Sequence, residues 1–214
     1  MTLLKPEQLT DISERTLSHY NGSAASFWEG TRDHDVSQNI NALLTVIDKE
    51  APCRILDFGC GPGRDLITLS ALGHTPVGLD GSANFCAMAR EHSGCEVLHQ
   101  DFLALDLPAA HFDGVFANAS LFHVPSQELG QVLGKLRESL VVGGVLFSSN
   151  PRGPNTEGWN GLRYGAYHDF DTWKRFVLKA GFEAIDHYYR PTGLPREQQP
   201  WLASTWRKTA SCRY

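Results

Sequence analysis

Three alternate glycines preceded by an acid form the stretch of this sequence best suited to binding chemistry. It follows the apolar residues Ile55 and Leu56 and runs Asp57-Phe58-Gly59-Cys60-Gly61-Pro62-Gly63. An apolar run that leads into such glycines predicts a buried strand, a tight turn and a helix N-terminus. Gly59 and Gly61 leave no Cβ between the backbone and a ligand. Gly63 and the helix start behind it present free N–H groups. The stretch therefore predicts a turn on which a flat ligand can lie close to the backbone.

The glycine spacing indicates which ligand that is. A dinucleotide fingerprint G-x-G-x-x-G counted from Gly59 needs a third glycine at position 64, which is Arg64. The observed pattern, Asp57-x-Gly59-x-Gly61-x-Gly63, resembles motif I of the class I S-adenosylmethionine-dependent methyltransferases. An ordinary tight turn between a strand and a helix remains the alternative for this stretch taken alone.

Acids after the next two predicted strands extend the pattern. Asp80 ends a strand at 75–80, where two carboxylate oxygens suit the vicinal diol of a ribose, although it could also cap the helix that follows. Asp101, after a strand at 96–98, can accept from an exocyclic adenine amine, and Phe102 offers its N–H and ring. A simple loop acid is the alternative for Asp101. We also assign Gly81, Ser82 and Asn118 to the cofactor site.

Strands and helices alternate along most of the chain. Strands are predicted at 53–58, 75–80, 96–98, 111–118 and 145–149, with helices between them, which is typical of a parallel sheet covered on both faces. The motifs at 57–63, 80, 100–102, 112–115 and 140–145 look like the successive motifs of class I methyltransferases. The resemblance implies a Rossmann-like, doubly wound α/β fold of seven strands with the last antiparallel. Strands at 182–190 and 201–208, after a helix capped by Asp169 or Asp171, fit this expectation.

Residues 1–35 combine aromatic and ionisable side chains without clean periodicity beyond a weakly helical segment at 6–16. They form either a surface arm or a lid over the pocket. As a lid, the aromatic faces of Tyr20, Phe27 or Trp28 could stabilise a sulfonium cation. Arg32 could then pair with the cofactor's carboxylate or with an anionic substrate.

An insert at 151–168 has no clear regular structure and is rich in recognition groups. A loop this long is more often functional than idle, although a surface crossover with anchoring aromatics is the alternative. Open α/β sheets bind ligands beyond the carboxyl ends of their strands. The candidate substrate-binding residues are therefore His34, His123, Asn150, Arg152, Trp159, Arg163, Tyr164, Tyr167 and His168.

A base is useful if the methyl acceptor is a protonated amine, hydroxyl or thiol, and histidine suits neutral pH. His123 is the first candidate because it follows the fourth strand, where many relatives of the family carry a histidine. A purely structural role is the alternative for this residue. The resemblance implies methyl transfer from S-adenosylmethionine to an N, O or S atom of a small metabolite, and the arginines, histidines and tyrosines of both loops favour one that bears a carboxylate. A non-catalytic S-adenosylmethionine-binding protein and, less favoured, a nicotinamide oxidoreductase are the alternatives.

The size and charge of the chain limit its domain organisation and its possible partners. A chain of 214 residues favours one domain, divided into an N-terminal arm at 1–35, a cofactor-binding core at 53–150 and the insert at 151–168. A formal charge of -5 and a pI near 6.0 argue against a nucleic-acid partner. No membrane span or signal peptide is evident, so we expect a cytoplasmic monomer or homodimer. The five cysteines, Cys212 among them, form no C-x-x-C pair. We therefore expect reduced thiols and no metal site.

Overall fold

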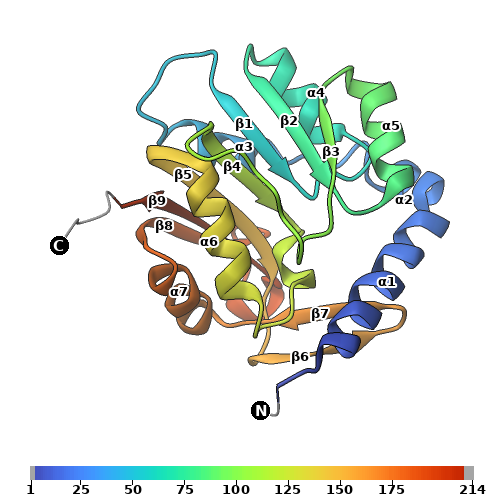
Figure 1. The fold of residues 1–214 in the computed structure, drawn as a ribbon. Helices are drawn as coiled ribbons and strands as arrows, with labels where there is room; N and C mark the ends of the chain where they lie inside the picture. The colour runs from blue at the N-terminus through green and yellow to red at the C-terminus, as the bar shows by residue number, and fades with distance from the viewer. Residues whose placement is uncertain (1–2, 210–214) are drawn as a thin grey trace.

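A seven-stranded sheet forms the centre of the computed structural model, which describes residues 3–209 (Figure 1). Its strand order is β3-β2-β1-β4-β5-β9-β8, and β9 runs antiparallel to both of its neighbours while the first five strands are parallel. This confirms the predicted seven strands and the antiparallel last strand. The strands are β1 Arg54–Phe58, β2 Thr75–Asp80, β3 Val97–His99, β4 Phe112–Asn118, β5 Leu140–Pro151, β8 Phe182–Arg190 and β9 Trp201–Lys208.

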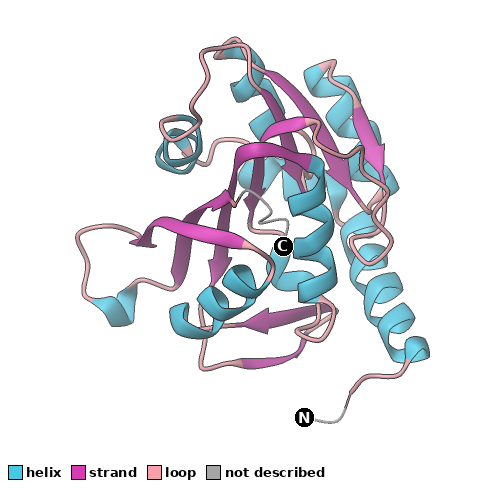
Figure 2. Ribbon diagram, turned by 60° about the vertical axis from the view of Figure 1, so that its left-hand side comes forward, coloured by secondary structure: helices cyan, strands magenta, loops and turns pink. Residues whose placement is uncertain are grey.

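Helices cover both faces of the sheet (Figure 2) because the strands are apolar on both sides. Successive side chains of a strand point to opposite faces, so Ile55 packs with one core cluster and Leu56 with the other. The first face carries α3 Ser37–Leu44, α4 Arg64–Ala71 and α5 Ala83–Ser93, and the second carries α6 Leu129–Ser139 and α7 Phe170–Lys179. Asp169 caps α7 by accepting from the Thr172 N–H at 2.8 Å, which is one of the two predicted caps.

The N-terminal arm is more regular than the sequence predicts. It forms α1 Pro6–Gly22 and α2 Ala24–Thr31, and only Ile12 and Thr16 of α1 are buried. Because α1 has no wide apolar stripe, its periodicity is weak; tertiary contacts hold it across the carboxyl ends of the strands. In Figure 1 it runs from the hairpin β6–β7 toward α5.

The insert at 151–168 is not irregular, which corrects the prediction made from its sequence. It contains the antiparallel hairpin β6 Thr156–Asn160 and β7 Arg163–Tyr167, joined by a turn with Gly161 at a φ of 62°. The strands carry Gly158 and Gly165 and lack the apolar alternation that identifies a strand in sequence. Contacts with α1 and with the 3-10 helix η1 Leu121–His123 support the hairpin instead.

The structure of residues 3–209 bears on the state of the cysteines and on membrane-spanning helices. Cys53, Cys60 and Cys86 are free thiols in the core, and Cys95 is partly exposed, whereas Cys212 lies outside the described residues. No helix in this range combines the length and the apolar character needed to cross a bilayer.

Replacing Gly63 with alanine tests how tightly the glycine turn packs on α5. Gly63 has a φ of 97°, and a Cβ there would lie 2.9 Å from the Ala89 backbone. Gly73 has a similar φ of 84° but faces open space, so Gly73→Ala is the matched control. The left-handed conformation costs either alanine about 1–2 kcal/mol, and we expect overpacking to add about 1–3 kcal/mol for Gly63→Ala alone. Urea unfolding measures the difference; equal losses would contradict the close packing.

Candidate active site

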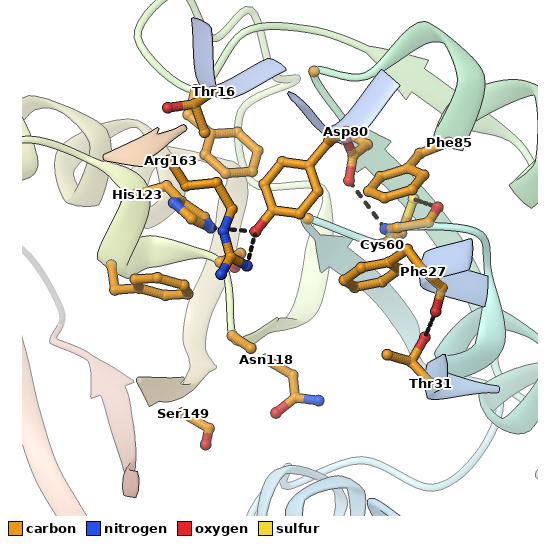
Figure 3. A pocket seen from close by; sticks show the side chains of 18 of the residues that line it. Thr16, Phe27, Thr31, Cys60, Asp80, Phe85, Asn118, His123, Ser149 and Arg163 are labelled. Carbon is orange, nitrogen blue, oxygen red and sulfur yellow. Dashed lines mark hydrogen bonds between the residues drawn. The ribbon is translucent and has the colours of Figure 1, made fainter. Parts of the chain in front are cut away.

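One cavity of about 660 Å³ lies beyond the carboxyl ends of the central strands, under α1 and α2 (Figure 3). Its wall includes the glycine turn after β1, the ends of β2, β4 and β5, and residues from both N-terminal helices. In Figure 3, Asp80 and Phe85 lie on one side and His123 and Arg163 on the other. This is the switch point of the strand order, where β1 and β4 are neighbours and the connections diverge.

The glycine turn is open toward the cavity at Gly61. Gly59 and Gly61 have φ values of 80° and 52°, which favour glycine. A Cβ on Gly59 would collide with Ser120, whereas a Cβ on Gly61 would meet only the Phe27 ring at 3.7 Å. A planar group can therefore approach the backbone of this turn without meeting a side chain of the turn itself.

Asp80 links that turn to the end of β2. Its Oδ2 accepts from the Gly61 N–H at 3.0 Å and its Oδ1 from the Ser82 N–H at 2.8 Å. Burial raises the pKa of Asp80 to about 6, although both backbone hydrogen bonds act in the opposite direction. Each oxygen keeps a lone pair beyond its backbone bond, and the residue lines the cavity. The carboxylate can thus accept from hydroxyl groups of a ligand.

Three residues assigned to the cofactor lie beneath the cavity wall instead. Asp57 is 1 % exposed, and burial together with the nearby Asp65 raises the pKa of its carboxyl well above the usual range. Ser82 accepts from the Phe85 N–H and donates to Asn21 Oδ1, so it caps α5. Gly63 packs against α5, as described above. These residues support the turn without facing the space above it.

Aromatic rings and one acid form the side of the cavity nearest α1 and α2. Phe102 stacks on Phe58 at 4.2 Å between ring centroids, and Trp28 stacks on His92 at 4.3 Å. Asp101 accepts from the Leu103 N–H at 2.8 Å and from the Ser13 hydroxyl of α1. The N-terminal arm therefore closes this side of the cavity through both packing and hydrogen bonds.

A second part of the wall contains Tyr20 of α1 and His123 in direct contact. His123 Nδ1 lies 2.6 Å from the Tyr164 carbonyl oxygen, and its Nε2 lies 2.8 Å from the Tyr20 hydroxyl. A carbonyl only accepts, so Nδ1 carries the hydrogen and Nε2 accepts from Tyr20. Burial lowers the pKa of His123 to about 4 and raises that of Tyr20, so both groups are neutral near pH 7. Arg163 Nη1 donates to the same tyrosine oxygen at 3.4 Å.

A chain of hydrogen bonds fixes Asn118 on the floor of the cavity. The Tyr188 hydroxyl donates to Asn39 Oδ1 at 2.9 Å, and Asn39 Nδ2 donates to Asn118 Oδ1 at 2.9 Å. The amide nitrogen of Asn118 then lies 3.4 Å from Asp65 Oδ2, whose carboxylate is also bound by Arg64. Asn118 is therefore held in one orientation by contacts from α3 and α4, and the α3 residue is itself fixed by β8.

The structure brings together many of the residues assigned from sequence and leaves others outside. The cavity wall includes Tyr20, Trp28, Gly59, Gly61, Asp80, Gly81, Asp101, Phe102 and Asn118 from the cofactor set, and His34, His123 and Arg163 from the substrate set. Arg32 lies outside it, paired with Glu29 and Asp33 on the surface. Asn150, Arg152, Trp159, Tyr164, Tyr167 and His168 do not line the cavity either.

The insert residues have other contacts because most of the hairpin faces away from the cavity. Arg152 donates to the carbonyls of Gln199 and Arg196 and so braces the β8–β9 connection. Trp159 lies under the Arg15 guanidinium at 3.8 Å. Tyr164 is buried and contributes its carbonyl and N–H rather than its ring. Asn150 and His168 line a separate small hollow, whereas Tyr167 packs close to Gly153 and Gly165.

Sequence reasoning missed several residues of the wall, notably Arg64, Asp65, Ser149 and Arg190. Arg64 and Asp65 directly follow the glycine turn, and that position could have identified them. Arg190 ends a strand that joins the sheet at its far edge, and nothing in the local sequence indicates that it reaches the site. Among residues 3–209, no three His, Cys, Asp or Glu side chains are grouped to hold a metal ion.

The sequence is similar to those of known methyltransferases. Residues 55–144 match the family model described as a methyltransferase domain. The chain is 25% identical over 142 residues to a probable S-adenosyl-L-methionine-dependent methyltransferase TehB of Haemophilus influenzae, covering 64% of this chain and 49% of the relative. It is 33% identical over 111 residues to a trans-aconitate 2-methyltransferase of Methylobacterium nodulans, covering 51% and 42%. The chain thus spans about half the length of the curated relatives it matches.

A solved structure extends the similarity to the whole fold. The 1,6-didemethyltoxoflavin-N1-methyltransferase of Burkholderia thailandensis, crystallised with 1,6-didemethyltoxoflavin and S-adenosylhomocysteine, matches with a TM-score of 0.77. The match covers 98% of this chain and 93% of that one at 20% identity, which shows the fold. Together these findings confirm the predicted resemblance to S-adenosylmethionine-dependent methyltransferases and the predicted fold, and the names of these relatives agree with the predicted cofactor.

The protonation state of His123 can be measured directly. Its folded pKa of about 4 lies below the ordinary 6.5 of the unfolded chain. The imidazole should therefore stay neutral, with hydrogen on Nδ1, from pH 8 to about pH 5. Since the unfolded state binds more protons between these two pKa values, this group makes the fold less stable as the pH falls from about 6.5 toward 4. Nitrogen-15 NMR of the ring reports its protonation state and its tautomer. A titration midpoint near 6.5 would contradict the geometry.

Proposed function

We propose that this chain, whose residues 55–144 match a methyltransferase domain, transfers the methyl group of S-adenosylmethionine to a small, carboxylate-bearing metabolite. The observation that carries the proposal is the single cavity that joins the Gly59–Gly61 turn and Asp80 to Tyr20, His123 and Arg163. One space thus contains both a nucleoside-binding turn and a second, cationic end.

The residues at the first end fit the cofactor. Asp80 would hold the ribose hydroxyls, and the open backbone at Gly61 would admit the methionine part. Asp101 and Phe102 would contact the adenine. The cofactor supplies an activated methyl group on a sulfonium, so in-line transfer requires chiefly positioning and exclusion of water. The aromatic wall of α1 and α2 provides that exclusion here.

The second end favours an anionic acceptor. Arg163 lines the cavity and, among the described residues, has no carboxylate within 4.0 Å. An unpaired guanidinium in a partly apolar pocket favours a carboxylate, which it can bind through two parallel hydrogen bonds. Two curated relatives are named trans-aconitate 2-methyltransferases, and aconitate is a carboxylate anion, which agrees with this preference.

Tyr20, rather than His123, would be the residue that directly receives a proton from such an acceptor. The neutral His123 Nε2 is occupied by the Tyr20 O–H, and the tyrosine oxygen faces Arg163. If the acceptor atom carries a proton, Tyr20 can take it while passing its own proton to His123 Nε2. The imidazolium charge formed in this way replaces the sulfonium charge that methyl transfer removes, so the net charge of the cavity does not change. His123 then acts through Tyr20, which refines its predicted role as the base.

Replacing Asp80 with asparagine tests the cofactor end. An amide has one acceptor oxygen for two backbone N–H groups and the ribose, so we expect Asp80→Asn to weaken S-adenosylhomocysteine binding about tenfold or more. Asp106→Asn, at an exposed acid outside the cavity, should bind like the parent. Calorimetric titration measures both, and a parallel titration with NAD(H) should show no heat. Tighter binding of NAD(H) than of S-adenosylhomocysteine would favour the oxidoreductase alternative.

Replacing Tyr20 with phenylalanine tests transfer itself and separates an enzyme from a protein that only binds the cofactor. The parent should form S-adenosylhomocysteine from S-adenosylmethionine with one or more members of a panel of small amino, hydroxy and thiol carboxylates. Tyr20→Phe keeps the ring but loses the proton acceptor, so kcat should fall about 100-fold, with cofactor affinity kept within about threefold. A parent without turnover on the panel would argue against this substrate class. An unchanged kcat in Tyr20→Phe would contradict a role of Tyr20 in proton transfer.

A further inference from the structure

We propose that the acceptor half of the cavity contains two anion subsites, at Arg163 and at Arg190, and therefore takes a small molecule with two acidic groups. The inference rests on the proposed function, which requires only one carboxylate, and makes its substrate class more specific. Arg190, which forms the second subsite on β8, does not belong to the substrate set assigned from sequence. Its evidence is the distribution of charge around the cavity.

Three arginines line the cavity, and one of them is already neutralised. Arg64 binds Asp65 through two hydrogen bonds, Nε to Oδ1 at 2.7 Å and Nη2 to Oδ2 at 2.9 Å. At the cofactor end, Asp80 and Asp101 are occupied by backbone N–H groups and by the Ser13 hydroxyl. Of the three arginines, Arg64 alone is therefore paired with a carboxylate of the protein, while Asp80 and Asp101 are held by neutral donors.

Arg163 retains most of its hydrogen-bonding capacity. Within residues 3–209, its guanidinium donates to the Tyr20 hydroxyl at 3.4 Å and lies 5.9 Å from the centre of that ring. A guanidinium has five N–H donors, so several remain for a ligand. Because Arg163 begins β7 directly before Tyr164, whose carbonyl holds His123, its position is tied to the Tyr20–His123 pair.

Arg190 has the same excess of donors at a different wall. It ends β8, opposite Trp201 in the β8–β9 register, and its Nη2 donates to the Asp35 carbonyl at 3.3 Å. The Asp35 carboxylate is not within ion-pair distance and accepts instead from the Ser37 N–H at 2.9 Å. Neither Arg163 nor Arg190 thus has a carboxylate partner in the described part of the chain.

The two cations come from separate parts of the fold. Arg163 lies on β7, which packs against η1 after the end of β4, whereas Arg190 lies on β8, three positions further along the sheet order β4-β5-β9-β8. At about 4.8 Å between neighbouring strands, β4 and β8 are about 14 Å apart. We therefore place the two guanidiniums at different walls, where a single carboxylate would not satisfy both. A molecule with two acidic groups can pair with each of them, with the apolar Pro191 and Trp201 beside it.

Calorimetry on the full chain saturated with S-adenosylhomocysteine tests the two subsites. The probes are glutarate against pentanoate and adipate against hexanoate, pairs that differ only in the second carboxylate. At least one diacid should bind about tenfold or more tightly than its monoacid partner. Arg163→Gln and Arg190→Gln should each abolish that advantage. Arg175→Gln, at an exposed arginine of α7 outside the cavity, should keep it.

Several outcomes would overturn the inference. Equal binding of diacids and monoacids, no binding of either diacid, or an unchanged diacid preference in Arg190→Gln would each do so. A tenfold loss of S-adenosylhomocysteine affinity in either variant would assign that arginine to the cofactor and also overturn it. If the parent does not bind S-adenosylhomocysteine, the proposed function fails by itself, and the same titrations on the unliganded chain still decide whether two anion subsites exist.

Discussion

The carboxylate of Asp80 is the group on which the rest of the site depends. Its two oxygens accept from Gly61 and Ser82, so one side chain fixes the turn after β1 and the start of α5 at the end of β2. The neighbouring strands β1 and β2 deliver both turns to the same edge of the sheet. Burial opposes ionisation of this acid and the N–H donors favour it. A ligand hydroxyl would therefore meet an acceptor that is already aligned.

The cavity exists because the first part of the chain lies over that edge. Helix α1 is tied to the cofactor end by Ser13 and Asn21 and to the hairpin by Thr16, whose Oγ1 accepts from the Tyr164 N–H at 3.1 Å. These are polar contacts with residues far away in sequence. They hold a helix with little apolar surface of its own, and they let aromatic rings from α1 and α2 exclude water from the space below.

The acceptor end combines neutral proton-carrying groups with fixed positive charge. Burial, and more weakly the charge of Arg163, lowers the pKa of His123, so the imidazole is an acceptor for the Tyr20 hydroxyl near pH 7. A neutral imidazole also avoids repelling a bound sulfonium. Positive charge in this half is therefore concentrated on arginines, which remain protonated and can bind acidic groups.

The sequence by itself determined the sheet, the glycine turn and the position of Asp80. These features depend on local patterns: apolar runs of strand length, glycines where the backbone takes a positive φ, and an acid at a strand end. It also placed Tyr20, His123 and Arg163 in the candidate site. Only the tertiary structure decided that Arg152, Trp159 and His168 point elsewhere, that the insert is a hairpin, and that Arg190 reaches the cavity. Such facts depend on how separate segments pack together: Arg152 contacts Gln199, 47 residues away, and Arg190 contacts Asp35, 155 residues away, and no local spacing encodes that packing.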